Sequence, residues 1–171
     1  MPKTLADGKT KFTLLTTKPA DPAAPTETEL NAGIDASHKV LKSDFAWTNT
    51  ASEVISEPAL DDEGNTSAPG ASNYDLGATF WRYFLETGAA DTAGDDAAFQ
   101  AVKEKGTQLW GYARETSKDS GEPWAATDEI YLGGEIMTDS ATKVDATGYV
   151  KRRVAFMPQR MHENIVVASG I

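Results

Sequence analysis

The residues of this chain whose types allow chemistry are few and scattered. Its 171 residues contain no cysteine and two histidines, His38 and His162, which lie far apart in the sequence. The absence of cysteine excludes disulfides, thiolate zinc sites and cysteine nucleophiles. The sequence has no His-Glu-x-x-His motif, no Gly-x-Ser-x-Gly elbow and no phosphate-binding glycine loop. We therefore expect no catalytic, cofactor or metal site, and we do not expect an enzyme.

Acidic residues occur in two pairs and one run. The pair Asp95-Asp96 precedes a helical pattern, where carboxylates accept hydrogen bonds from the free N–H groups of the first turn, so we interpret it as helix capping. The pair Asp128-Glu129 stands at the start of a predicted strand. The run from Asp61 to Asn65 offers oxygen ligands but lacks the alternate-residue spacing of a calcium loop. A solvated loop is the better interpretation of that run.

One basic run, Lys151-Arg152-Arg153, stands out in a chain whose formal net charge is −10. In an acidic protein such a run is a place where copies of the chain attract one another. A strand alternates its side chains, so the three residues do not present a single face to nucleic acid. A plain solvated face remains the other interpretation. We keep Lys151, Arg152 and Arg153 as candidates for contacts between subunits.

The negative charge also bears on partners. Binding that wraps nucleic acid depends on lysine and arginine releasing counterions from phosphates, so the charge of −10 argues against it. Two explanations of the acidity stay open: it keeps the protein soluble, or it lets nucleic acid pass without holding it. No segment approaches the roughly 20 apolar residues of a membrane-spanning helix, so we expect a soluble protein without membrane insertion.

The elements that must position these residues centre on residues 73–114. Residues 74–84 are too densely aromatic and apolar for a loop and predict a core strand covered on both faces. Residues 95–105 predict a helix of about three turns that ends at Gly106, which can turn left-handed. Residues 107–114 alternate in polarity and predict a second strand. A single helix covering a sheet is the simplest arrangement.

Further strands are predicted on both sides of this unit. They lie at residues 11–16, in two or three segments between 30 and 60, and at 129–138, 149–156 and 164–168. The dipeptide Gly133-Gly134 is expected to bend or bulge its strand. With roughly eight to ten strands and one helix, the sequence predicts a mainly β fold, a β-sandwich or barrel with one flanking α-helix.

Two segments have no evident role in a core. Residues 1–29 combine a strand with an extended arm containing Pro19, Pro22 and Pro25, which is either a loose linker or an arm that orders on a neighbouring subunit. We therefore divide the chain into this N-terminal part and a β domain at residues 30–171. Residues 61–73 form a turn-rich loop that is longer than compact domains usually contain, which favours a functional role.

Four phrases of the sequence, at residues 54–60, 69–74, 95–107 and 147–154, carry a family resemblance. Together they resemble the major tail proteins, or tail tube subunits, of long-tailed phages, particularly of siphoviruses that infect actinobacteria. The resemblance covers about residues 30–168. Its phrases are structural rather than chemical, and the proline-rich arm lies outside them.

The resemblance implies a structural virion protein with a β-sandwich and a flanking helix. Six copies would close into a ring, and stacked rings would form a tube through which double-stranded DNA travels into the host without specific binding. The implied partners are other copies of the chain and the tape measure, tail terminator and distal tail proteins. The implied location is the virion tail, after assembly in the host cytoplasm. Six copies would carry about −60 per ring, which repels phosphate within a Debye length of about 10 Å.

We expect the long loop at residues 61–73 and the N-terminal arm to bridge successive rings, because neither has a role in a core. The candidates for this contact between rings are Asp61, Asp62, Glu63, Asn65 and Pro69. Another structural virion protein, such as a tail terminator or a head decoration protein, would share the composition but form single rings or trimers. An enzyme or ligand-binding module would need a concave site with convergent polar groups, which these residues do not suggest.

Overall fold

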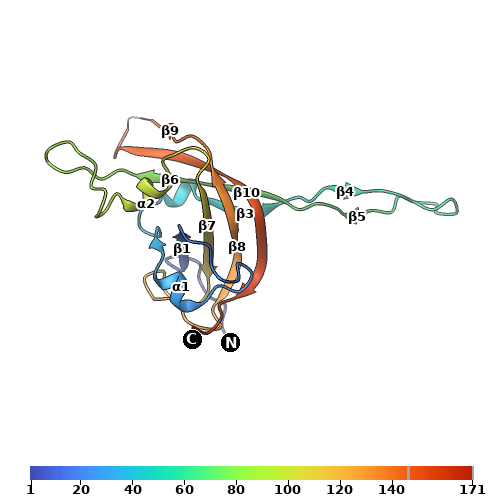
Figure 1. The fold of residues 1–171 in the computed structure, drawn as a ribbon. Coiled ribbons are helices and arrows are strands. Elements are labelled where there is room, and N and C mark those ends of the chain that lie inside the picture. The colour runs from blue at the N-terminus through green and yellow to red at the C-terminus, as the bar shows by residue number, and fades with distance from the viewer. Residues whose placement is uncertain (146, 171) are drawn as a thin grey trace.

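The computed structural model describes residues 1–145 and 147–170 and has a mainly β fold (Figure 1). In chain order the elements are β1 (Thr10–Leu15), α1 (Glu27–Asn31), β2 (Ile34–Asp35), the 3-10 turn η1 (Lys42–Asp44), β3 (Ala46–Thr50), β4 (Val54–Ile55), β5 (Ala68–Pro69), β6 (Asn73–Trp81), α2 (Ala97–Val102), β7 (Gln108–Glu115), β8 (Glu129–Thr138), β9 (Thr142–Lys143) and β10 (Lys151–Val166). The predicted mainly β fold is confirmed.

One antiparallel sheet carries the body of the protein, with the strand order β2-β1-β7-β8-β10-β6-β3 and with β9 paired to β10. The long strand β10 joins its two parts, because residues 151–155 pair with β6 and residues from Phe156 onward pair with β8. The ends of the sheet then face each other: the ring of Phe12 in β1 lies 4.8 Å from that of Trp47 in β3. The sheet thus folds over into a sandwich, as predicted.

The curvature of β10 has a local cause. Its register against β8 shifts between Pro158 and Arg160, which marks a β-bulge. Gly134 in β8 has φ +153°, and a Cβ at this position would overlap the carbonyl oxygen of Arg160. The bend expected at Gly133-Gly134 therefore lies beside the bulge, with the extra residue in β10. The prediction of two separate strands at 149–156 and 164–168 is wrong. Both belong to the single strand β10.

The core has two parts on opposite faces of β7. Leu109 and Ala113 join the large cluster between the two layers of the sandwich. Trp110 and Tyr112 join a smaller cluster on the outer face, beneath α1. The predicted alternation of β7 is confirmed, and both faces of the strand are buried because each is covered by different segments.

The proline-rich arm packs on its own subunit. Pro19 and Pro25 are buried, and the Tyr112 hydroxyl donates a hydrogen bond of 2.9 Å to the carbonyl of Pro22. The arm leads into α1, a helix the sequence analysis missed, which starts with a capping box formed by Thr26 and Glu29. Neither a loose linker nor an arm ordered on a neighbour describes this segment. The division of the chain at residue 29 stays a prediction.

The predicted flanking helix is present but shorter than expected. It spans Ala97–Val102 rather than residues 95–105, and it buries Ala98, Phe99 and Val102 against the sandwich. Gly106 follows with φ +81°, the left-handed conformation expected of it. The side chain of Asp96 makes no capping hydrogen bond to α2, so the capping interpretation of this residue is wrong.

Candidate assembly surfaces

Residues 51–72 form a narrow hairpin that projects far from the body (Figure 1). It continues β3 and β6, and within it β4 and β5 pair only at Val54 with Pro69 and Ile55 with Ala68. Val54 is 71% exposed and Leu60, at the tip, is fully exposed. The loop predicted at residues 61–73 forms the outer and returning part of this hairpin. The strand predicted near Val54 exists, but it lies outside the domain core.

The hairpin is strongly acidic, and we call it the acidic hairpin. Its charged residues are Glu53, Glu57, Asp61, Asp62 and Glu63, and it contains no lysine or arginine, so it holds half of the formal net charge of −10. The Asp62 carboxylate accepts a hydrogen bond of 2.7 Å from the Ala59 N–H and so fixes the tip. An exposed segment that combines apolar residues with charge of one sign is a candidate contact surface.

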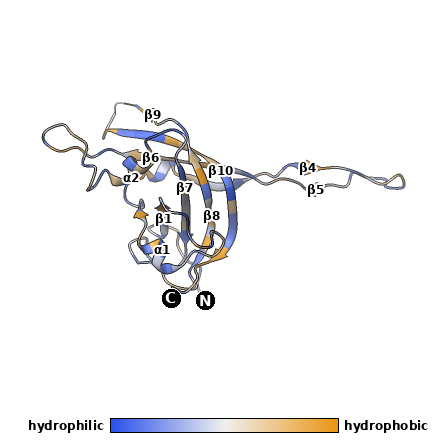
Figure 2. Cartoon of the chain, in the orientation of Figure 1, coloured by the Kyte–Doolittle hydropathy of each residue, from blue (hydrophilic) through white to orange (hydrophobic). Residues whose placement is uncertain are grey.

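The three residues of the basic run lie at the start of β10 but play different parts. Arg153 forms an ion pair of 2.8 Å with Asp44 and is held against the body. Lys151 donates to the carbonyl of Thr147 at 2.8 Å, and Arg152 donates to the carbonyl of Lys151 at 2.9 Å. Figure 2 shows this start of β10 as a hydrophilic stretch.

A second cation faces the basic run from β9. Lys143 stands directly opposite Arg152 in the ladder between β9 and β10. Within the described part of the chain, neither of them nor Lys151 has a carboxylate within 4.0 Å. We call Lys143, Lys151 and Arg152 the basic patch. Tyr149 and Val150, which are 81% and 50% exposed, lie next to it in the chain.

The free edge of β10 is a third surface. Residues 151–155 pair on one edge with β6, but residues 157–166 pair only with β8 among the described strands. The residues of this stretch are exposed or half-buried, and they include Met157, which is 45% exposed. An unpaired strand edge presents free N–H and C=O groups that another chain can complete. The outer edge of β3 has the same property within the described residues.

A buried ion pair fixes the segment between β6 and α2. Asp96 is fully buried and accepts hydrogen bonds from the Arg82 guanidinium at 3.0 Å, the Tyr83 N–H at 2.9 Å and the Gln100 amide at 2.7 Å. Burial by itself would raise the pKa of Asp96, but the hydrogen bonds from Arg82 and Gln100 outweigh it and hold the pKa below its ordinary value. The Arg82 guanidinium also lies 4.1 Å from the Phe99 ring centroid.

A second buried cluster holds the loop between β7 and β8. Arg114 is fully buried and donates to Asp128 at 2.9 Å and to the carbonyls of Pro123 and Asp119 at 3.0 and 2.9 Å. Burial would raise the pKa of Asp128, but hydrogen bonds from Lys118 and Arg114 lower it. The pair Asp128-Glu129 does stand at the start of β8, and Asp128 fixes this loop.

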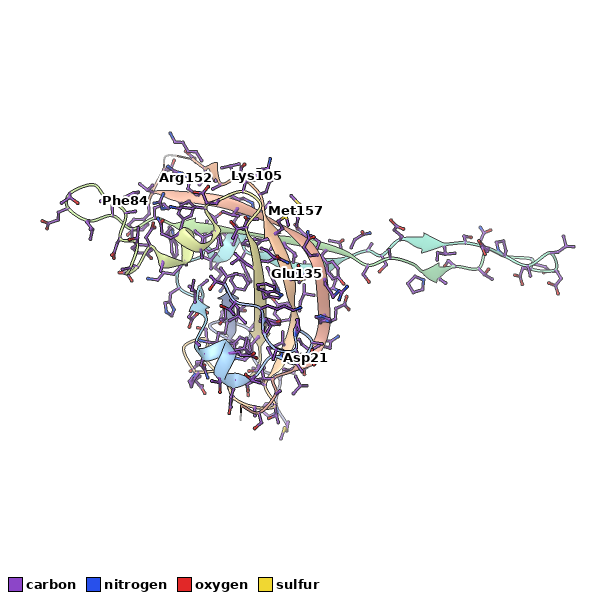
Figure 3. The ribbon with its side chains drawn as sticks, viewed as in Figure 1. Asp21, Phe84, Lys105, Glu135, Arg152 and Met157 are labelled. Carbon is purple, nitrogen blue, oxygen red and sulfur yellow. The ribbon has the colours of Figure 1, made fainter. Side chains whose placement is uncertain are left out.

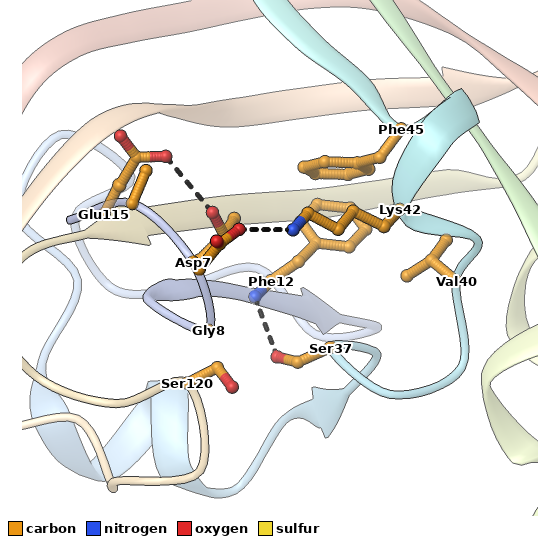
Figure 4. Close-up of a pocket in the computed structure, with 11 residues that line it drawn as sticks. Asp7, Gly8, Phe12, Ser37, Val40, Lys42, Phe45, Glu115 and Ser120 are labelled. Carbon is orange, nitrogen blue, oxygen red and sulfur yellow. Dashed lines mark hydrogen bonds and ion pairs between the residues drawn. The ribbon is translucent and has the colours of Figure 1, made fainter.

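A cleft of about 370 Å³ lies at the seam of the sandwich (Figure 4). Its apolar floor consists of Phe12, Val40 and Phe45. At its rim Lys42 and Asp7 form an exposed ion pair of 2.6 Å. Neither histidine lines it.

Two negative findings apply to residues 1–145 and 147–170. No group of three His, Cys, Asp or Glu side chains is placed to hold a metal ion. No helix is long and apolar enough to span a membrane.

Comparison with protein families identifies a match. A family model described as phage tail tube protein matches residues 1–170, which is nearly the whole chain and includes the proline-rich arm that the sequence resemblance did not cover. No curated protein matches the chain.

Proposed function

The chain belongs to the phage tail tube protein family, and from this membership we propose that six copies close into a ring and that stacked rings form a conduit for double-stranded DNA. As a member of this family the protein is a structural component of the virion tail that associates with itself into a tube. Members of the family are in general not enzymes. We place the assembly of the tube in the host cytoplasm and the phage among the siphoviruses.

Ring closure through strand edges is supported by the unpaired edges of β10 and β3. In a ring each subunit contacts one neighbour through one strand edge and the other neighbour through the second edge. No edge then remains free to recruit further chains. The free stretch of β10 and the outer edge of β3 both lie on the side of β10 that faces away from β8. We propose that backbone hydrogen bonds between these edges join the subunits.

Passage of DNA is supported by the charge. Six copies carry about −60 per ring, and the part of this charge that faces the bore repels phosphate within about 10 Å at 0.1 M salt. A bore lined with lysine and arginine would instead bind the backbone, since each phosphate contact adds affinity. In the proposed function DNA therefore slides through without specific binding.

Stacking of the rings is assigned to the acidic hairpin. Asp61, Asp62, Glu63, Asn65 and Pro69 remain the candidates for contact between rings, because they are exposed and lie in a segment that projects from the body. Lys151 and Arg152 remain candidates for contact between subunits. Arg153 is already paired with Asp44 and contributes less to such a contact.

The proposed partners follow from a tube of fixed length. A tape measure protein sets the length, a tail terminator closes one end and a distal tail protein closes the other. The alternative function is another structural virion protein that forms a single ring, namely a tail terminator or a head decoration protein. The two functions differ in whether rings stack.

Negative-stain electron microscopy of the purified protein tests the proposal. We expect hollow tubes with a regular axial repeat, and end-on views with sixfold symmetry. Monomers, single rings or trimers at the same protein concentration and salt would refute the tube. Tubes of normal length from a variant that lacks residues 54–69 would refute the role of the acidic hairpin in stacking.

A further inference from the structure

The acidic hairpin and the basic patch lie on different sides of the molecule. Figure 1 shows the hairpin extending from one side of the body and β9, with the start of β10, at the other, and Figure 3 shows Arg152 on that far side. We infer that the two surfaces meet between copies: the acidic hairpin of one copy docks on the basic patch of a second copy. This inference rests on the proposed tube and names the two surfaces that join its subunits.

The acidic hairpin lacks compensation within its own chain. None of its five carboxylates takes part in an ion pair within the described residues. Val54, Ile55 and Leu60 are more than half exposed on the same segment. Charge of one sign keeps a segment hydrated. Exposure of the apolar side chains beside it to water is unfavourable, and a partner that covers them lowers the free energy. The partner of this hairpin must therefore be both cationic and apolar.

The basic patch has these two properties. Lys143 and Arg152 face each other across two paired strands, and like charges in that position destabilise the pair. A carboxylate of the same chain could offset the repulsion between Lys143 and Arg152. Without one, an anionic partner can offset it instead. The nearby Asp145 accepts a hydrogen bond from the Thr147 N–H and, among the residues the structure describes, forms no ion pair within 4.0 Å. Tyr149 and Val150 supply the exposed apolar surface next to the cations.

The contact has to form between copies. A two-stranded hairpin of about eleven residues per strand reaches roughly 35 Å, but it points away from the patch of its own chain (Figure 1). Two different surfaces of one chain that fit each other make a head-to-tail contact, and such contacts repeat into rings or stacked arrays. Double-stranded DNA is the other polyanion in this system, so the test must separate it from a second copy.

Charge reversal with rescue tests the docking. One variant combines Asp61→Lys with Glu63→Lys and spares Asp62, because Asp62 fixes the tip of the hairpin. A second combines Lys143→Glu with Arg152→Glu, and a third carries all four changes. We expect each pair alone to lower the yield of tubes by about tenfold or more, and the four changes together to restore it to within about twofold of the wild type.

A matched control changes charge elsewhere. Lys3 and Lys18 are exposed and lack an ion pair in the described structure, so Lys3→Glu with Lys18→Glu changes the net charge as much as the patch variant does. This control should form tubes at the wild-type yield. Circular dichroism and thermal denaturation of every variant separate lost docking from lost folding.

Three results would overturn the inference. The first is normal tube yield from both charge-reversed pairs, and the second is no recovery in the variant with all four changes. The third is a patch variant that forms normal tubes but no longer retards a linear DNA duplex in a gel, which would make the patch a DNA contact. Failure of the wild type to form tubes would refute the proposed function instead.

Cross-linking tests the contact in whichever oligomer forms. The chain has no cysteine, so Asp61→Cys with Lys143→Cys introduces the only two thiols. Mild oxidation should give a ladder of covalently linked chains on a non-reducing gel. Asp61→Cys with Lys18→Cys is the control and should give no ladder above background. Equal ladders from both variants, or none from the first, would overturn the docking.

Discussion

Replacing Asp96 by alanine tests how the segment between β6 and α2 is held. The substitution removes the acceptor of the hydrogen bonds from Arg82, Tyr83 and Gln100 and leaves the Arg82 guanidinium without its carboxylate. The Arg82 side chain is only 13% exposed, so water replaces the lost partner poorly. The variant therefore has an unpaired charge near the core.

The size of the loss in the free energy of unfolding distinguishes two roles for Asp96. Loss of a helix cap costs about 1 kcal/mol, whereas breaking a buried ion pair from one side costs about 3–5 kcal/mol. The structure assigns Asp96 to the second case, because the side chain is fully buried and caps no N–H group of α2. We therefore expect a loss of about 3–5 kcal/mol in the free energy of unfolding at pH 7.

Urea unfolding followed by the fluorescence of the four tryptophans measures this loss. With a slope of about 2 kcal/mol per M, the midpoint should fall by about 1.5–2.5 M. The neighbouring Asp95→Ala is the control: its ion pair with Lys39 is exposed, so its loss should stay below about 1 kcal/mol. Equal losses for the two variants, or a loss near 1 kcal/mol for Asp96→Ala, would refute the reasoning.

The ion pair of Asp96 with Arg82 predicts that the stability of the protein depends on pH. The folded protein holds the pKa of Asp96 below the ordinary value of 3.8, so this carboxylate contributes its full stability above that value. The contribution is lost as the pH falls through the lower pKa of the folded state. The difference in stability between wild type and Asp96→Ala should therefore shrink below about pH 4. A difference that is constant from pH 7 to pH 2.5 would contradict the ion pair.

Three further predictions concern the bulge, the second buried cluster and the hairpin. Gly134→Ala should lower stability by about 2 kcal/mol or more in thermal denaturation, because a Cβ there overlaps the backbone of Arg160; an unchanged melting temperature would contradict this. Arg114→Leu should cost about 3–5 kcal/mol in urea unfolding, because it removes the buried guanidinium and leaves Asp128 with only Lys118 and the Ala125 N–H; a loss below 1 kcal/mol would argue against the cluster. Replacing residues 54–69 by a short turn should leave the melting temperature of the subunit within about 3 °C of the wild type, since the hairpin lies outside both core clusters; a larger drop would show that the body depends on it.

The parts of the fold that follow from local pattern could be predicted from the sequence. The alternation of β7 was recognisable because each face packs against a different cluster, and both clusters need apolar residues. The dense aromatic and apolar run of β6 identified a core strand, because Leu76, Ala78 and Phe80 pack in the large cluster. The left-handed conformation of Gly106 was predictable because few other residues adopt its positive φ, but α2 itself ends earlier, at Val102.

The remaining features depend on distant contacts and left little local signal. The partner of Asp96 is Arg82, on the far side of a loop, and from the sequence alone the pair Asp95-Asp96 reads equally well as a cap. Strand β10 continues through exposed residues with no apolar alternation, so it looked like two strands. The short α1 could have been found from the capping box of Thr26 and Glu29, but five residues give no helical period.

The assembly surfaces also combine features that the local sequence predicts with features that depend on distant contacts. The acidic loop and the basic run were visible as charge, and both are at the surface of the subunit. The projection of residues 51–72 from the body was not predictable, because β4 and β5 look like ordinary short strands in sequence. The place of Lys143 opposite Arg152 depends on the register of β9, which two residues do not specify.

Electron cryomicroscopy of assembled tubes, at a resolution that shows side chains, tests most directly whether copies of this chain surround an acidic bore. We predict six copies per ring, subunits joined along the edges of β10 and β3, and a bore whose exposed side chains carry a net negative charge. A protein that remains monomeric at high concentration, or a bore lined mainly by lysine and arginine, would contradict the proposed function.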